Sequence, residues 1–225
     1  MNRTISIPVT AIMAIIIATS LTFFSCASGK DDDTPSSSSA GGSSSSAEAF
    51  IDERDNKTYE WVEIGTQTWM AENLNYDVPN NDTDRCYSDE TDRDYCATYG
   101  RLYNWETAKT ACPSGWHLPI DAEWTILVTY VGGETGAKLK ATSDWYSEDG
   151  YITGIDSYGF SALPGGNGYS DGSFLDVGGN GFWWTGSEYD SNLAYNWGMY
   201  YYSSDAERNY NTKTSLFSVR CVKDN

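Results

Sequence analysis

This 225-residue chain has near its start an uncharged, almost wholly apolar run from Ile5 to Phe24, followed by a Ser- and Gly-rich stretch. The two segments restrict where the chain can build a packed domain. With Arg3 as a minimal basic flank, the apolar run has the pattern of a signal segment. Residues 27–49 contain no aromatic residue, so burial cannot offset the entropy cost of ordering them. We therefore expect a signal peptide at residues 1–25, a disordered tether at 26–49 and a single domain at 50–225.

The end of the apolar run resembles a bacterial lipoprotein processing site, where a cysteine is acylated after cleavage. Cys26 follows the run LTFFS and is the expected lipidation (palmitate) site. Lys30 and the three aspartates behind it resemble the acidic export tag of surface lipoproteins of Bacteroidetes-like bacteria, with an ordinary solvated charge run as the alternative. We expect a lipid-anchored outer-membrane protein exposed on the bacterial surface. The alternative, an uncleaved membrane anchor, also places the domain outside the cytoplasm.

Acidic residues outnumber basic residues by 32 to 14, which gives a net charge of −18 at neutral pH. Proteins that bind nucleic acid by neutralising phosphates need a basic surface, so this composition excludes nucleic acid as a partner. The same charge repels anionic lipid headgroups and polyanions. The expected partners are a neutral polysaccharide or a cell-surface protein, and we expect no cofactor.

Four cysteines lie in the expected domain, and cysteines of exported proteins are more often disulfides than free thiols. Four cysteines allow three pairings. A bridge between Cys86 and Cys96 would close a short polar loop, and Cys112 would then pair with Cys221 across more than 100 residues. A cysteine-ligated metal site is the alternative, but the chain lacks C-x-x-C spacing, so we expect no metal centre.

Sequence periodicity predicts an α+β domain with two helices, short antiparallel strands and long loops. A hairpin is predicted near the start of the domain, because aromatic and polar residues alternate over 57–64, Gly65-Thr66 can form a turn, and 67–70 can form a second short strand. Apolar residues recur at helical spacing in 100–112 and in 121–131. The Gly- and aromatic-rich second half predicts further strands at 159–166, 181–186, 194–202 and 216–222.

Carboxylates crowd the segment 77–94, which is too polar to form a core. They offer oxygen ligands for Ca²⁺, but no stretch matches the EF-hand loop, which needs Gly at its sixth position. His117 is the only histidine and lies between Trp116 and Leu118, so we expect a buried structural residue rather than a catalytic base. Ser-His-Asp chemistry would have to recruit this one histidine, and we expect no enzymatic activity.

A series of motifs in residues 50–225 resembles the Fibrobacter succinogenes major paralogous domain, a family of exported, often lipid-anchored bacterial proteins without an established function. The motifs are DERDNKTYEWVEIGTQTWMAENLNY, YGRLYNWETA, CPSGWHLPIDAEW, GFSALPGG, FWWTGSE and SVRCVKD.

The segment GWHLPIDAEW, a later Trp-Trp strand and the final SVRCV are also similar to the C-type lectin-like and formylglycine-generating-enzyme-like group. This second resemblance implies a single, disulfide-stapled C-type-lectin-like domain in which Cys112 on a helix pairs with Cys221 on the last strand. The lectins' calcium–sugar signature is absent, and so is the second redox cysteine of the enzymes. The resemblance therefore carries over no catalytic residue.

Aromatic residues make up 15% of the chain, and their rings can stack on sugar rings while carboxylates and amides bond to sugar hydroxyls. Tyr200, Tyr201 and Tyr202 cannot all face one core, because successive strand residues point to opposite faces. We expect a non-catalytic surface module that binds neutral glycan or another cell-surface polymer. The alternatives are a structural or assembly component that binds proteins, and a hydrolase with paired carboxylates. The candidate ligand-binding residues are Trp184, Tyr189, Asp190, Tyr195, Tyr200 and Tyr202.

Overall fold

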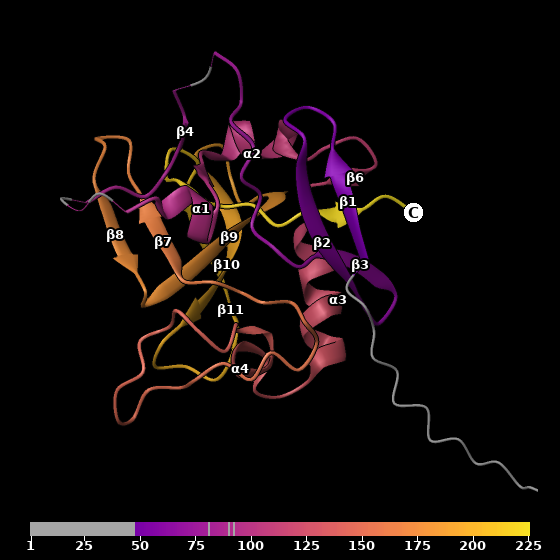
Figure 1. Cartoon of the computed structure of the whole chain (residues 1–225), viewed down its shortest axis with the longest axis vertical. Coiled ribbons are helices and arrows are strands. Elements are labelled where there is room, and N and C mark those ends of the chain that lie inside the picture. Colours follow the sequence, from indigo (N-terminus) through magenta and orange to yellow (C-terminus); the bar gives the residue numbers. More distant parts are fainter. Residues whose placement is uncertain (1–47, 81, 90, 92) are drawn as a thin grey trace, which may run out of the picture. The chain divides into compact units, whose positions relative to one another are not determined.

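A computed structural model of the chain describes residues 48–80, 82–89, 91 and 93–225 (Figure 1). The predicted signal peptide, the lipidation site Cys26 and nearly all of the predicted tether lie outside the described residues. The last two residues of that tether begin the first strand, β1 (Glu48–Asp52). No helix in the described part of the chain is long and apolar enough to span a membrane.

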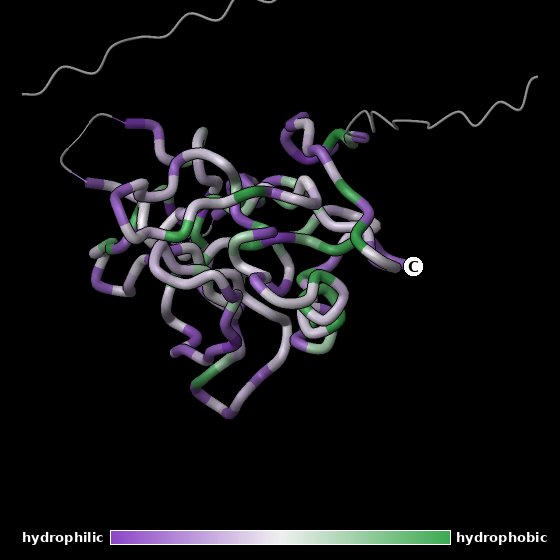
Figure 2. The backbone as a smooth tube through the Cα atoms, turned by 90° about the horizontal axis from the view of Figure 1, so that it is seen from below, coloured by the Kyte–Doolittle hydropathy of each residue, from purple (hydrophilic) through white to green (hydrophobic). Residues whose placement is uncertain are grey.

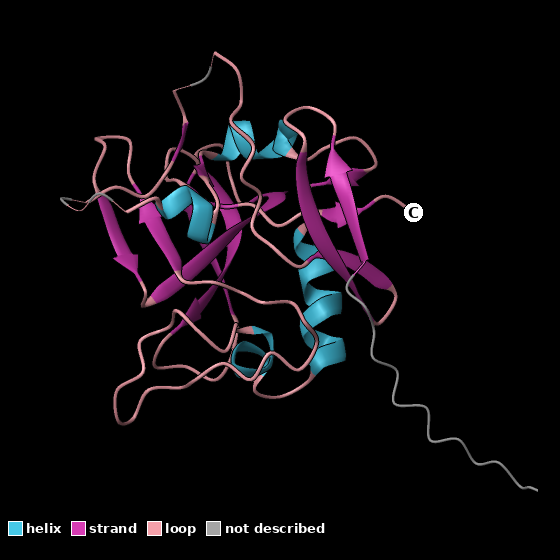
Figure 3. Ribbon diagram, viewed as in Figure 1, coloured by secondary structure: helices cyan, strands magenta, loops and turns pink. Residues whose placement is uncertain are grey.

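Strands, not helices, dominate the fold. About 35% of the described residues are in strands and 16% in helices, and the strands form two curled sheets that resemble half-barrels (Figure 3). The predicted α+β, C-type-lectin-like domain with two helices and a few short strands is therefore wrong. Periodicity missed strands such as the polar ERNYNT segment at 207–212, because nearly every residue in it is polar and no apolar alternation marks it.

The smaller sheet joins the two ends of the domain, with the strand order β1-β2-β3-β13-β6. Its central hairpin, β2 (Lys57–Ile64) and β3 (Gln67–Met70), lies where the alternation predicted it. The C-terminal strand β13 (Val222–Lys223) pairs with β3 on one side and with β6 (Trp116–His117) on the other. The end of the chain therefore completes a sheet that the first strands began.

The larger sheet has eight strands, with β11-β10-β9-β12-β5-β4 along its main path, β7 paired with β9, and β8 paired with β7. The hairpin of β9 and β10 and the outer strand β11 form its most regular part. The strands are β4 (Asp84–Arg85), β5 (Leu102–Tyr103), β7 (Gly165–Gly168), β8 (Phe174–Val177), β9 (Asn180–Glu188), β10 (Leu193–Tyr200), β11 (Glu207–Thr212) and β12 (Phe217–Ser218).

The two predicted helices are confirmed, as α2 (Trp105–Ala111) and α3 (Asp121–Val131). The first is shorter than predicted because the Asn104 side chain accepts a hydrogen bond from the backbone N–H of Thr107 at 2.9 Å, which caps the helix there. Two further short helices were not predicted, α1 (Tyr95–Tyr99) and α4 (Thr135–Leu139).

Two adjacent tryptophans on β9 divide the hydrophobic interior into two clusters. Trp183 points to the cluster under α3, where its ring lies 6.3 Å from that of Trp124. Trp184 points the other way, and its ring lies 4.5 Å from that of Phe217. Because successive strand residues face opposite sides, one central strand serves both clusters. Figure 2 shows the hydrophilic segments mainly in the outer loops.

A fully buried arginine connects segments that are far apart in the sequence. The guanidinium of Arg220 makes five hydrogen bonds, of which two go to Asn73 Oδ1 at 3.2 and 2.7 Å. The others go to the backbone oxygens of Met70, Phe160 and Ser161. All of these acceptors are neutral, and burial without a carboxylate partner lowers the pKa of Arg220.

Two disulfides fasten the domain, and the pairing inferred from the sequence is confirmed. Cys86 pairs with Cys96, 10 positions later in the chain. Cys112, at the end of α2, pairs with Cys221 beside β13, 109 positions later. The short bridge closes the acidic loop, whereas the long bridge ties the middle of the chain to its end.

The two bridges should differ in their contribution to stability. In the chain-entropy model, removing the bridge with the larger loop costs about 5 kcal/mol and removing the other costs about 3 kcal/mol. We therefore expect the Cys112→Ala/Cys221→Ala variant to unfold at a lower urea concentration than the Cys86→Ala/Cys96→Ala variant. A larger loss of stability in the second variant would show that loop length does not set the order.

Candidate functional site

The residues predicted to bind ligand do not share one surface. Tyr195 of β10 lies opposite Tyr210 of β11, on the face where Trp197 stacks against α3. Tyr200 belongs to the opposite face, where its hydroxyl accepts a hydrogen bond from Asn209 of β11. The alternation of strand side chains therefore separates the candidates into two groups.

Trp184 belongs to neither group, because it is fully buried. Its indole N–H donates to the backbone oxygen of Tyr103 at 2.8 Å. The prediction that Trp184 binds ligand is therefore wrong. The Trp184 ring lies in the core cluster, 4.5 Å from that of Phe217, so it is covered rather than presented to solvent.

Tyr189 and Tyr195 belong to an aromatic cluster at the end of the β9–β10 hairpin. The rings of Tyr189 and Tyr210 stack at 4.2 Å and are about half exposed. Tyr195 meets Tyr189 edge to face at 5.4 Å, and the Arg208 guanidinium lies 3.8 Å above the Tyr195 ring. Arg208 also forms an ion pair with Asp121 at 2.8 Å. We call Tyr189, Tyr195, Arg208 and Tyr210 the Tyr189 cluster.

Asp190 lies beside this cluster, but its contacts are local. One carboxylate oxygen accepts hydrogen bonds from the backbone N–H groups of Asn192 and Leu193, at 2.7 and 2.8 Å. Such bonds fix the turn between β9 and β10. The structure thus gives Asp190 a role in shaping the turn.

The second group surrounds Tyr200 on the other face of β10. A side chain at Gly198 would place its Cβ 2.7 Å from the Tyr200 hydroxyl, so the Tyr200 ring occupies the space above that glycine. The amide of Asn209 donates to the Tyr200 hydroxyl at 3.0 Å. Phe182 meets the Tyr200 ring edge to face at 5.7 Å. Glycine is therefore required at position 198 for Tyr200 to lie along the sheet.

Tyr202 extends this aromatic surface into solvent. Its ring stacks on that of Tyr200 at 5.3 Å with an interplanar angle of 25°, and the side chain is 58% exposed. Glu207 lies opposite Gly198 in the β10–β11 register, which places it beside Tyr200. We call Phe182, Tyr200, Tyr202, Glu207 and Asn209 the Tyr200 platform.

Amide groups continue the polar part of the same sheet face. Asn211 donates to Asn196 Oδ1 at 3.0 Å, and Asn196 lies opposite Asn209. Asn196 Nδ2 and Asn180 Oδ1 have no hydrogen-bond partner among the described residues. Asn180 lies opposite Tyr200 in the β9–β10 register. Asn196 itself is fully buried, so the amides that accompany the aromatic rings at the surface are the partly exposed Asn180, Asn209 and Asn211.

The tyrosine hydroxyls of the platform stay protonated. Burial raises the pKa of Tyr200 to about 12, and the nearby charge of Glu207 adds to the shift. Burial, followed by the charge of Glu207, also raises the pKa of Tyr202. Both hydroxyls therefore remain neutral groups that can donate or accept a hydrogen bond at physiological pH.

Sequence reasoning missed several residues of these surfaces, namely Phe182, Glu207, Asn209 and Tyr210. Three of them lie on β11, which the polar sequence ERNYNT concealed. Pairing that segment antiparallel with 193–200 would have placed Tyr210 opposite Tyr195 and Glu207 opposite Gly198.

Several described carboxylates of the acidic segment 77–94 make contacts within the fold. Asp77 pairs with Arg101 at 2.6 Å, and Asp94 accepts a hydrogen bond from the N–H of Ala97, which caps α1. Asp89 accepts hydrogen bonds from Thr91. In the part of the chain that the structure describes, no three His, Cys, Asp or Glu residues come together as a metal site.

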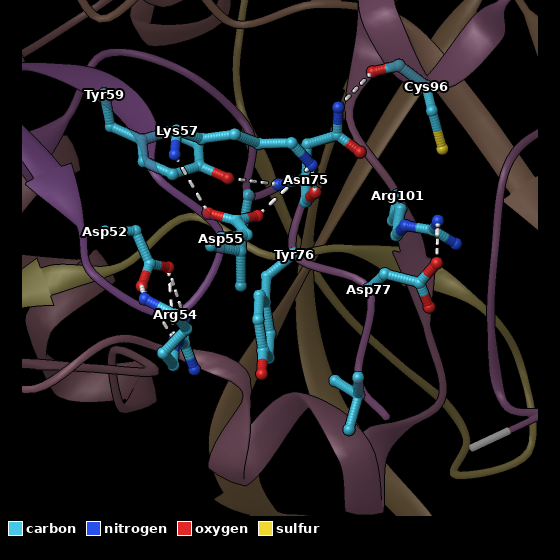
Figure 4. A network of polar contacts seen from close by, with 12 residues as sticks. Asp52, Arg54, Asp55, Lys57, Tyr59, Asn75, Tyr76, Asp77, Cys96 and Arg101 are labelled. Carbon is cyan, nitrogen blue, oxygen red and sulfur yellow. Dashed lines mark hydrogen bonds and ion pairs between the residues drawn. The ribbon is translucent and has the colours of Figure 1, made fainter. Parts of the chain in front are cut away.

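Further polar contacts fasten the segment before this loop to the rest of the domain (Figure 4). Asn75 donates from its backbone to the Tyr59 hydroxyl at 3.0 Å and from its side chain to the backbone oxygen of Cys96 at 2.9 Å. Arg54 pairs with Asp52 at 2.7 Å and lies 3.8 Å above the Tyr76 ring. These contacts hold β1, β2 and α1 around one segment.

His117 is ion-paired rather than buried. Its Nδ1 lies 2.7 Å from Asp224 Oδ1, its Nε2 lies 2.9 Å from Glu123 Oε1, and its side chain is 40% exposed. The predicted burial of His117 is therefore wrong, because β6 presents it to carboxylates at the domain surface. Both ring nitrogens contact carboxylates rather than a hydroxyl or thiol, so the pairing needed for nucleophilic catalysis is missing.

Stability should depend on pH through His117. Burial lowers its pKa, but hydrogen bonds to Glu123 and Asp224 raise it by more, so the pKa lies above its usual value. The stabilisation is fully present below the unfolded pKa of about 6.5 and is lost as the pH rises through the folded pKa. We expect His117→Gln to cost about 0.5–1 kcal/mol at acidic pH and less at alkaline pH. Urea unfolding of both proteins at about pH 5.5 and at about pH 9 measures the loss of unfolding free energy. An equal loss at the two pH values would contradict the proposed role of His117.

Comparison with known proteins gives one match. The model of the family described as Fibrobacter succinogenes major domain matches residues 62–223. No curated protein and no solved structure matches the chain. The matched residues include the whole Tyr200 platform and the Tyr189 cluster.

Proposed function

The chain belongs to the Fibrobacter succinogenes major domain family, and we propose that it is a non-catalytic module that binds neutral glycan through the Tyr200 platform. The stacked pair of Tyr200 and Tyr202, with Tyr202 58% exposed, carries this proposal. An exposed ring gives the apolar face of a sugar a surface to stack on, and the neighbouring amides and hydroxyls can bond to sugar hydroxyls.

The platform is also preorganised, which favours binding. Asn209 holds the Tyr200 hydroxyl, Gly198 leaves room for the ring, and Phe182 supports its edge. A ligand that stacks there does not have to order Tyr200 first, so less side-chain entropy is lost on binding. Tyr202 is the more exposed ring and offers most of the accessible aromatic surface.

We further propose that the module is a lipoprotein of the bacterial outer surface, lipidated at Cys26 and separated from the membrane by its Ser- and Gly-rich segment. The two disulfides support a location outside the cytoplasm, because such bonds form and persist in oxidising compartments. A soluble, extended polymer is the kind of ligand that a tethered surface module can reach.

The Tyr189 cluster supports a second candidate function, the binding of a protein partner. Tyrosine and arginine are enriched among the residues that dominate protein interfaces. Tyr189, Tyr210 and Arg208 form such a set on the opposite face from the platform. A structural or assembly role would use this cluster and would not depend on Tyr202.

Replacing Tyr202 tests the glycan proposal. The full chain, with both disulfides formed, is first applied to an array of neutral polysaccharides, and an oligomer of the best ligand is then titrated by calorimetry. We expect Tyr202→Ala to weaken binding about tenfold, equivalent to ~1.4 kcal/mol, because a stacking contact is lost. The thermal midpoint should stay close to that of the unmodified protein.

Tyr130→Ala is the matched control, because Tyr130 is also a tyrosine with 58% exposure but lies on α3. It should leave the affinity unchanged. If the folded protein binds no neutral polysaccharide, or if both variants lose affinity equally, the proposed function is wrong.

A further inference from the structure

The Tyr200 platform carries negative charge that no ion pair neutralises. Glu207 stands beside the Tyr200 ring, because it lies opposite Gly198 and the ring covers that glycine. Asp176 of β8 is a second carboxylate whose charge acts on the hydroxyls of both Tyr200 and Tyr202. Neither carboxylate takes part in an ion pair with another described residue.

Two cations in β11 and just after it are engaged elsewhere. Arg208 follows Glu207 in the chain but points to the other face of the sheet, where it pairs with Asp121. Lys213 pairs with Glu188 at 2.9 Å. Neither side chain therefore neutralises the carboxylates of the platform.

Lys140 lies behind the platform and is fully buried. Its ammonium donates to the backbone oxygens of Tyr200, Ser203 and Ile152, at 2.5, 2.8 and 3.4 Å. These three bonds use all three N–H donors of the ammonium. Lys140 thus holds the backbone of Tyr200 from the interior. On the exposed side, the carboxylates have no cationic partner among the described residues, and the aromatic ring of Tyr202 is open to solvent.

We infer that the Tyr200 platform selects sugars that carry a protonated amine over uncharged sugars of the same ring size. This inference rests on the proposed glycan binding at the same site. The face of an aromatic ring attracts an ammonium group through its quadrupole, and a carboxylate beside the ring adds to that attraction. The ligand class is a polysaccharide of 2-amino sugars. For an exposed site these contributions together amount to about a tenfold gain in affinity.

Three oligosaccharides of equal length test the selection on the full, oxidised chain. They are a 2-amino sugar oligomer, its fully N-acetylated form and a glucose oligomer, each titrated by calorimetry at a pH where the amine is protonated. We expect the amino form to bind about tenfold more tightly than the other two. The difference should shrink when the pH is raised above the pKa of the sugar amine and when salt is added.

Glu207→Gln should remove most of the preference for the amino form, measured as the ratio of its affinity to that of the fully N-acetylated oligomer. Glu63→Gln is the matched control, because it removes the same charge from an exposed glutamate on β2 of the other sheet. An equal effect of the two variants would mean that the amine responds only to the net charge of −18, and would overturn the inference.

The remaining outcomes separate this inference from the proposed function. Equal affinity for all three oligomers would leave glycan binding in place and refute the selection. Binding of none of them would refute the selection, and the glycan proposal would be refuted as well if the array of neutral polysaccharides also gave no ligand. Tight binding of a lysine hexapeptide that Tyr202→Ala does not weaken would show a general cation surface and would also refute the selection.

Discussion

The buried guanidinium of Arg220 is the interaction on which the rest of the domain depends. Transferring a charged group from water into the interior is costly unless every donor finds an acceptor. Arg220 meets this condition with neutral oxygens of Asn73, Met70, Phe160 and Ser161. Because these residues belong to the end of β3, the loop after it and a distant loop, all three segments must be in place before the charge is stabilised.

Asn73 connects Arg220 to the strands that carry the Tyr200 platform. Its Oδ1 also accepts the indole N–H of Trp183 at 2.8 Å, and its amide donates to the backbone oxygen of Tyr99 at 2.9 Å. Trp183 fixes β9, and β9 pairs with β10, which carries Tyr200. Lys140 adds a second buried cation, bonded to the backbone oxygen of Tyr200. The position of the platform therefore follows from two buried cations, Lys140 bonded to backbone oxygens and Arg220 bonded to backbone oxygens and to the Asn73 side chain.

Local patterns in the sequence predicted local structure well. The alternation of residues over 57–64, followed by Gly65, identified the hairpin of β2 and β3 with its correct bounds. In the structure Gly65 has a φ of 66°, which glycine adopts readily in a turn. The short polar loop between Cys86 and Cys96 identified the disulfide pairing. Three consecutive tyrosines indicated that Tyr200, Tyr201 and Tyr202 could not all face one core, although the sequence did not show that Tyr202 is the exposed one.

The sequence could not reveal what depends on distant partners. Arg220 sits in an ordinary strand pattern, and nothing near it indicates that its acceptors lie more than fifty residues away. Trp184 resembles an exposed aromatic until the sheet order shows that β9 is central. The polar strand β11 supplies two of the five residues of the Tyr200 platform, yet only its pairing with β10 makes it a strand.

Urea unfolding of Arg220→Met, compared with Arg208→Met, tests the central claim most directly. Arg208 pairs with Asp121 at the surface, where such pairs contribute at most about 1 kcal/mol. Removing the Arg220 guanidinium withdraws donors from several buried oxygens, each worth about 1–3 kcal/mol. The account predicts that Arg220→Met loses about 3–5 kcal/mol of unfolding free energy, or does not fold. A loss no greater than that of Arg208→Met would show that hydrophobic packing alone organises the domain.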